Sequence, residues 1–177
     1  MMADFPLDHV YQLLEPGPVV LLTTSRRGRP NVMTMSWHMM VDFMPPLVAC
    51  VVSQADHSFA ALRATRECAI AIPAVDLAPI AVAVGNASGR EVDKFQAFGL
   101  TPQPAERVKA PLIAECFANF ECRVADTRMV NRYNLFVLEV VKAWTDPARA
   151  ESKTIHHRGF GTFAVDGEII RLDSRMP

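Results

Sequence analysis

Small polar side chains alternate with bulky apolar ones between residues 31 and 39. If this segment is one extended strand, successive side chains point to opposite faces. One face then carries Val32, Thr34, Ser36 and His38, and the other carries Asn31, Met33, Met35, Trp37 and Met39. A strand face in bulk water usually carries Lys, Glu or Arg. The face with Thr34, Ser36 and His38 carries none of these residues. It is therefore either part of a core, with its hydroxyls bonded to neighbouring backbone, or a sheltered surface that receives a ligand.

A helix start follows closely along the chain and adds a second group of polar residues. Leu47 to Val52 is typical of a buried strand, and His57 to Thr65 is expected to form a helix with Asp56 as its N-cap. Free N–H groups and the helix dipole at such a start favour a phosphate, for which Lys94 could supply a counter-charge. The alternative is that Asp56 or Ser58 only caps the helix and that Lys94 is a solvated surface charge.

Three further features have both a structural and a functional interpretation. Trp37 is either a core indole or a wall beside a planar ligand. The arginines of the Arg26–Pro30 turn most simply solvate that turn, and phosphate binding is the minor alternative. Gly159 to Ala164 formally matches the G-x-G-x-x-A pattern of dinucleotide sites, but too few residues follow for the rest of such a fold. We expect a Gly-rich turn before a late strand instead.

The elements that must position these residues are mostly strands joined by short connections. A hairpin turn at Gly28 and a capping box at Ser88–Glu91, whose helix ends at Gly99, are the clearest local signals. The expected helices are Pro6–Leu14, His57–Thr65, Val75–Val84 capped by Asp76, and Ser88–Phe98; the expected strands are Val19–Ser25, Asn31–Met40, Leu47–Val52, Glu67–Pro73, Leu112–Arg128, Leu135–Trp144 and Gly167–Leu172. Such a pattern favours a closed or split antiparallel barrel over a parallel doubly wound sheet.

Composition limits the class of protein. With 177 residues, half of them hydrophobic, residues 1–177 are expected to form a single domain with a substantial core. The formal charge of −1, without a basic patch, favours small-molecule partners over nucleic acid or a membrane. With neither a membrane-length apolar run nor a signal-peptide pattern, we expect a cytoplasmic protein.

The cysteines are expected to be buried, reduced thiols. Cys50, Cys68, Cys116 and Cys122 have no C-x-x-C spacing, and three of them lie in apolar, strand-like surroundings. A zinc site formed by Cys116, Cys122 and the pair His156-His157 is the minor alternative.

Six parts of the chain together resemble the flavoredoxin branch of the flavin reductase-like, FMN-binding split-barrel family. They are, in order, NVMTMSWHM, the Pro45-Pro46 pair, ADHSFAALRAT, SGREVDKFQAFGLTP, APLIAECFANFECRV and IHHRGFGTF. The resemblance covers nearly the whole chain. It implies a mainly β fold with short helices, a six-stranded antiparallel Greek-key split β-barrel. It also implies a homodimer with one FMN per subunit near the interface, to which the tract around Tyr133, Leu135 and Phe136 could contribute.

The resemblance also implies which residues bind the cofactor. The family's first flavin segment corresponds to Thr34, Met35, Ser36 and Trp37. The phosphate segment corresponds to Ser53–Ser58, with Ser53, His57 and Ser58, and the third segment to Asn86–Ser88, with Asn86, Ser88 and then Lys94. Many relatives have a basic residue and a hydroxyl before the phosphate helix, and Gln54-Ala55-Asp56 differs from this. That departure implies weaker phosphate binding, or binding through backbone N–H groups.

The function implied is that of an FMN-dependent oxidoreductase of the flavin reductase type. NADH or NADPH would reduce the bound flavin, which would pass electrons to free flavin, ferric iron or a similar acceptor. No catalytic side chain and no metal are needed, because the isoalloxazine carries the redox chemistry. The alternative is a non-catalytic FMN-binding or electron-carrier module.

Overall fold

The structure, a computed structural model, describes residues 2–14 and 17–173. One antiparallel sheet has the strand order β3-β2-β6-β9-β10-β5-β4, with β1 also paired to β10. Its strands are β1 (Ala3–Asp4), β2 (Val20–Arg26), β3 (Arg29–Met35), β4 (His38–Phe43), β5 (Pro46–Val51), β6 (Glu67–Ile72), β9 (Ala118–Asp126) and β10 (Leu135–Thr145). Two short pairs lie outside it, β7 (Pro102–Gln103) with β8 (Leu112–Ile113) and β11 (Ile155–His157) with β12 (Phe163–Val165).

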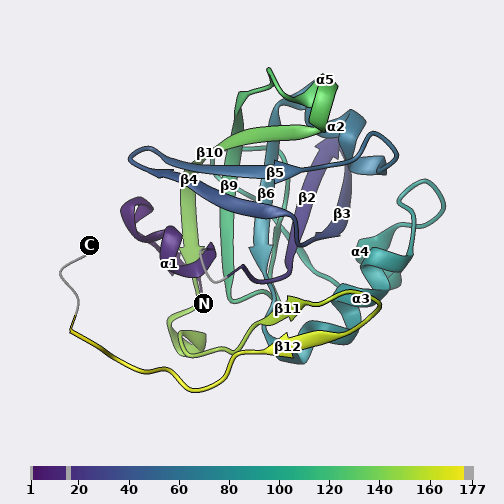
Figure 1. Ribbon diagram of the computed structural model, residues 1–177. Coiled ribbons are helices and arrows are strands. Elements are labelled where there is room, and N and C mark those ends of the chain that lie inside the picture. Colours follow the sequence, from purple (N-terminus) through teal and green to yellow (C-terminus); the bar gives the residue numbers. More distant parts are fainter. Residues whose placement is uncertain (1, 15–16, 174–177) are drawn as a thin grey trace.

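Short helices fill the connections around the sheet. The α-helices are α1 (Tyr11–Leu14), α2 (His57–Thr65), α3 (Ala78–Asn86), α4 (Lys94–Ala97) and α5 (Val130–Tyr133), and the 3-10 turns are η1 (Leu7–His9), η2 (Val75–Leu77) and η3 (Pro147–Arg149). In Figure 1, β4 and β5 cross in front of β9, β6 and β2, while α3 and α4 lie beside β3. The sheet therefore curls around an apolar core, and the expected split antiparallel barrel is confirmed with eight strands in its main sheet, not six.

The β2–β3 hairpin forms as expected. Arg27 and Gly28 take positive φ angles of 53° and 77°, the conformation that a two-residue hairpin turn requires. The expected single strand Asn31–Met40 is wrong, because β3 pairs with β2 only to Met35 and β4 starts at His38 against β5. The chain changes partner at this point, so side chains on either side do not share a face. Met35 is buried, whereas Trp37 is 71% exposed.

Other boundaries differ where a competing local interaction prevails. The helix expected from Ser88 begins only at Lys94, because the Asp93 carboxylate accepts hydrogen bonds from Phe95 N and Gln96 N and caps α4. Asp76 does not cap a helix and instead pairs with Arg149 at 3.0 Å.

Two of the expected strands also differ. The expected strand 112–128 is divided into β8 and β9, and the expected strand Gly167–Leu172 is an extended, exposed segment without a paired strand.

Two local expectations are confirmed. All four cysteines are buried and free. As to the zinc alternative, the described residues contain no group of three or more His, Cys, Asp or Glu side chains that could hold a metal ion. The Gly-rich segment is the turn between β11 and β12, with Gly159 and Gly161 at φ 92° and 72°.

Among residues 2–14 and 17–173, no helix combines the length and apolar character needed to cross a bilayer.

His38 gives the fold a defined response to acid. Its Nε2 lies 2.7 Å from Pro18 O, and its buried Nδ1 has no hydrogen-bond partner among the described residues. Burial lowers the pKa of His38 below its usual 6.5, although the backbone hydrogen bond partly opposes this. As the pH falls through about 6.5, the unfolded chain therefore takes up a proton before the folded one does, and the folded state loses stability.

We predict that the free energy of unfolding falls as the pH drops below about 6.5, by at most about 1.4 kcal/mol per pH unit from this histidine. His38→Gln should remove part of that fall, because a carboxamide can still donate to Pro18 O but does not titrate. Urea unfolding between pH 8 and 5 measures the effect. The exposed His9→Gln is the control, and identical pH profiles for His38→Gln and wild type would contradict the assignment.

Candidate functional site

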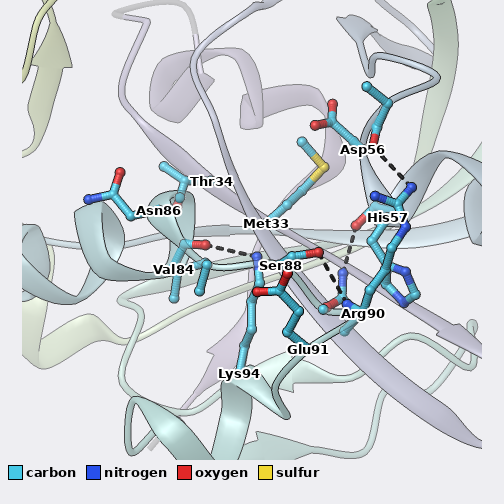
Figure 2. Close-up of a pocket in the computed structure, with 16 residues that line it drawn as sticks. Met33, Thr34, Asp56, His57, Val84, Asn86, Ser88, Arg90, Glu91 and Lys94 are labelled. Atoms are coloured by element: carbon cyan, nitrogen blue, oxygen red, sulfur yellow. Dashed lines mark hydrogen bonds between the residues drawn. The ribbon is translucent and has the colours of Figure 1, made fainter.

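A cavity of about 430 Å³ lies between β3, the first turn of α2, the end of α3 and the loop that leads to α4. Figure 2 shows side chains from all four segments converging on it. The sequence interpretation expected the β3 side chains and the α2 start to meet, and the structure brings them together.

The wall formed by β3 is held by two side-chain hydrogen bonds. Asn31 Nδ2 donates to Ser58 Oγ at 2.9 Å, and both residues are buried. Thr34 Oγ1 donates to Ala81 O of α3 at 2.5 Å. These bonds tie the edge strand to the start of α2 and to the middle of α3, so the wall is joined to a helix on both sides of the cavity.

The first turn of α2 is not capped by a side chain. The Asp56 carboxylate instead accepts a hydrogen bond from Ser53 N at 3.0 Å. Across the described ranges, the backbone N–H groups of His57 and Ser58 have no acceptor. Unsatisfied N–H groups at a helix start bear partial positive charge and bind anions.

Lys94 is the most unusual residue of the cavity. Its side chain is 5% exposed, and Nζ donates to Val84 O, near the end of α3, at 2.8 Å. No carboxylate of the described chain lies within ion-pair distance of it. Burial lowers the pKa of Lys94, and the charge of Asp56 only partly opposes this. The interpretation of Lys94 as a solvated surface charge is therefore wrong: it is a buried ammonium with donors to spare, facing the cavity (Figure 2).

Arg90 and His57 complete the positive end of the cavity. Arg90 Nη2 donates to Ala55 O at 3.1 Å, and Arg90 N donates to Ser88 Oγ at 3.3 Å. Loss of surrounding water and then the positive charges of Arg90 and Lys94 lower the pKa of His57, so this ring is mostly neutral at pH 7. The positive charge at this end therefore comes from Lys94 and Arg90.

The loop between α3 and α4 closes directly onto this end. A Cβ atom at Gly89 would overlap the side-chain amide of Asn31 and lie 2.8 Å from His57 Cδ2. Only glycine leaves room for the loop backbone to approach both residues this closely.

The structure brings six of the ten residues expected at the site together at the cavity: Thr34, His57, Ser58, Asn86, Ser88 and Lys94. Ser36, Trp37 and Ser53 lie on neighbouring segments and do not line it, and the Met35 side chain is buried in the core. His38, expected on the same polar face as Thr34, bonds to Pro18 O instead.

The expectation missed Asn31, Gly89 and Arg90 as site residues. Asn31 could have been found, because it is a lone carboxamide in a segment rich in methionine. Gly89 and Arg90 could not, because their place at the site depends on how the loop between α3 and α4 folds. The cavity as a whole is an anion site beside hydroxyl and amide groups, with Asp56 and Glu91 at its margin.

Comparisons with known proteins agree with this fold. A family model described as flavin reductase like domain matches residues 13–164. The uncharacterized protein YddH of Escherichia coli K12 is 34% identical over 177 residues, covering 92% of this chain and 93% of that protein. The structure of an FMN-binding domain of flavin reductases-like enzyme from Shewanella baltica OS155 matches with a TM-score of 0.92 and 25% identity over 98% of both chains.

Flavoredoxin of Desulfovibrio vulgaris (Miyazaki F) has the same fold, with a TM-score of 0.80 and 24% identity over 88% of this chain and 90% of that one. The family model thus spans most of the chain, and the likeness of fold extends over nearly its whole length. This chain therefore belongs to the flavin reductase-like family of FMN-binding split-barrel proteins.

Proposed function

We propose that this protein is an FMN-binding oxidoreductase in which NADH or NADPH reduces the flavin and the flavin then reduces free flavin, ferric iron or a similar acceptor. The observation that carries the proposal is the buried Lys94 ammonium, which faces a cavity and has no counter-ion in the described chain. A phosphate would supply that counter-ion. The structural relative from Shewanella is itself described as an FMN-binding domain, which supports FMN as the molecule that carries it.

The residues present fit such a group. Lys94, Arg90 and the backbone N–H groups of His57 and Ser58 would bind the phosphate. Farther along the cavity, Thr34, Asn86 and Ser88 offer hydroxyl and amide groups to the neutral, hydrogen-bonding parts of the cofactor. When bound, the isoalloxazine supplies hydride and electron chemistry, and the protein binds, orients and shields it.

The remaining expected residues would act from the rim of the cavity. Met35 could contribute only backbone groups, since its side chain is in the core. Trp37 is exposed, so the interpretation of it as a core indole is wrong and its ring is free to border the flavin. Ser36 lies between them, and Ser53 lies on the other side, where its Oγ accepts from Ala55 N at 3.2 Å and shapes the turn before α2.

FMN should bind at least two orders of magnitude more tightly than riboflavin, which has the same ring and ribityl chain but no phosphate. Several charge-assisted contacts of roughly 1.5 to 3 kcal/mol each account for a gap of that size. Lys94→Met should narrow the gap and leave riboflavin affinity almost unchanged, because the apolar stem is kept. Calorimetric titration measures this, with the exposed Lys109→Met as control. Equal affinities of the wild type for FMN and riboflavin would refute the phosphate site.

The FMN-loaded protein should lose its flavin absorbance near 450 nm when it is mixed with NADH or NADPH without oxygen. Stopped-flow absorbance gives the rate for each nucleotide, and addition of free flavin or ferric iron should restore the colour. If neither nucleotide reduces a tightly bound FMN, the oxidoreductase proposal is wrong and the protein is an electron-carrier or FMN-binding module.

We also propose that the protein is a homodimer. Of the tract first expected to contribute to the interface, Tyr133 is 50% exposed, but Phe136 is fully buried against Phe59 and Leu135 is half-buried, so its exposed apolar area is small. A better surface lies along the edge strand β4, which ends the sheet order. Apolar side chains are exposed along this strand and at its two ends, on both sides of the irregularity between Met40 and Asp42, and we call this set the β4 stripe. The members of this β4 stripe are Trp37, Met39, Val41, Phe43 and Met44, each at least 49% exposed.

A second copy is the partner that fits the β4 stripe. A two-fold axis lets one apolar surface cover itself, so no other partner is needed. The stripe is also continuous with the flavin site, because Trp37 follows Thr34 of the cavity wall by three residues. The dimer would therefore bring the partner close to the flavin, as the family resemblance implies.

Met39→Glu should convert the dimer into a monomer at micromolar concentration, because it places a charge at the centre of the β4 stripe. Val75→Glu, at an exposed apolar site away from β4, is the control and should remain dimeric. Light scattering coupled to size exclusion measures both. A wild-type monomer would refute the dimer, and a dimeric Met39→Glu would refute this interface.

A further inference from the structure

After β12 the chain continues as an exposed, extended segment, residues 167–173, which we call the C-terminal arm. Ile169, Ile170 and Leu172 of this arm are 72%, 68% and 79% exposed. Among the residues that the structure describes, the backbone N–H and carbonyl groups of the arm have no hydrogen-bond partner. The arm therefore carries large apolar side chains and unsatisfied backbone groups that its own subunit, as far as it is described, does not cover.

The start of the arm is held in place by Asp166. Thr154 N and Thr154 Oγ1 donate to Asp166 Oδ2 at 2.6 and 2.7 Å, and His156 Nε2 lies 2.6 Å from Asp166 Oδ1. Ile155 O in turn accepts a hydrogen bond from Val19 N at 2.7 Å, which ties the β11–β12 hairpin to the segment that leads into β2. The arm thus leaves the subunit from a fixed point, which lowers the conformational entropy that it would lose on docking.

Side chains alternate along the arm as they do along a strand. In an extended segment, Ile170 and Leu172 point to one side. Ile169, Arg171 and Asp173 point to the other side, which is mixed in character. With about 3.3 Å per residue, the seven residues of the arm span about 23 Å, slightly more than the six residues of β4. Its length and its apolar side suit the arm to lie along an edge strand.

The edge strand β4 offers a surface that matches the arm. It ends the sheet order, so no strand of the described chain pairs with its outer side, and such an edge can accept a further strand. The β4 stripe exposes five large apolar side chains and the arm exposes three, together eight of the fifteen that are exposed in the described chain. Each of the two surfaces therefore supplies the apolar contact and the backbone groups that the other lacks.

The β4 stripe by itself is small for a stable dimer. It has five residues, whereas a specific interface typically takes roughly 20 to 30 residues from each partner. In a dimer with a two-fold axis, two equivalent arms would add to the contact, one from each subunit. A second copy of this chain can therefore supply both the stripe and the segment that covers it.

We propose that the C-terminal arm of each subunit packs along β4 of the partner subunit, with Ile170 and Leu172 against the β4 stripe. In Figure 1 the arm runs along the lower edge of the molecule, away from β4 of its own subunit, so the β4 that it covers belongs to the second copy. The inference rests on the homodimer proposed above and adds a second contact to it.

The first test is the variant Ile170→Ser/Leu172→Ser in the full chain. Both side chains are largely exposed within their own subunit, so the variant should fold and its circular dichroism should match that of wild type. The dissociation constant of the dimer, measured by analytical ultracentrifugation, should rise at least tenfold. The matched control Val75→Ser/Val165→Ser replaces two exposed aliphatic side chains outside the arm and the β4 stripe, and it should keep the wild-type constant.

The second test locates the arm directly. The photoreactive residue p-benzoyl-phenylalanine replaces Ile170, and irradiation links this residue to whatever it touches. We expect covalent dimers on a denaturing gel, and mass spectrometry of the linked peptides should place the link within residues 37–44 of the other chain.

The inference is overturned if the double variant dimerises as tightly as wild type. It is equally overturned if irradiation links Ile170→p-benzoyl-phenylalanine within one chain, links two chains outside residues 37–44, or yields no covalent dimer. A wild type that is monomeric would refute the homodimer as well. FMN binding and its reduction by NADH or NADPH are measured separately, so any of these results leaves the proposed oxidoreductase activity standing.

Discussion

A buried ammonium that has no counter-ion among residues 2–14 and 17–173 is the constraint around which the cavity is built. Removing Lys94 from water is costly, and one backbone carbonyl, Val84 O, offsets only part of that cost. This arrangement depends on two helices. The last carbonyl groups of α3 have no partner within the helix, and α4, capped by Asp93, begins at Lys94 beside them. An anionic ligand bound at this end of the cavity would offset the desolvation cost of Lys94.

The split of the barrel provides the room for this cavity. Because β3 is an edge strand, its free side meets helices in place of another strand. The Asn31–Ser58 hydrogen bond joins that edge to α2, and the approach of Gly89 closes the loop over the joint. The other edge, β4, remains open and apolar. One edge of the sheet therefore borders the cavity, and the other exposes apolar side chains.

The sequence predicted correctly those features of the fold that depend on interactions between neighbouring residues. The Arg27–Gly28 turn, the helix from His57 and the buried cysteines all formed as expected, because turn conformation, helix periodicity and apolar surroundings are short-range properties. The family resemblance added the flavin, which no residue pattern here could name. Six of the ten expected site residues lie at the cavity for the same reason: their segments were correctly identified.

What could not be predicted depends on contacts between distant segments. The alternation from Asn31 to Met39 continues unbroken in the sequence, although the chain changes strand partner after Met35. The burial of Lys94 depends on the end of α3, ten residues away in sequence. Gly167 to Leu172 has the composition of a strand but no strand beside it. In each case the sequence records a local preference, and tertiary structure decides whether it is realised.

The burial of the four thiols bears on the proposed reaction, in which the bound flavin is reduced. Reduced flavin that reacts with oxygen releases hydrogen peroxide, which oxidises cysteine through its thiolate form. Burial raises the pKa of Cys50 and of Cys116, and a hydrogen bond with Cys122 together with burial raises that of Cys68. These groups therefore remain protonated and shielded from peroxide. In the proposed reaction, burial would therefore protect these thiols from the oxidant that reduced flavin generates in air.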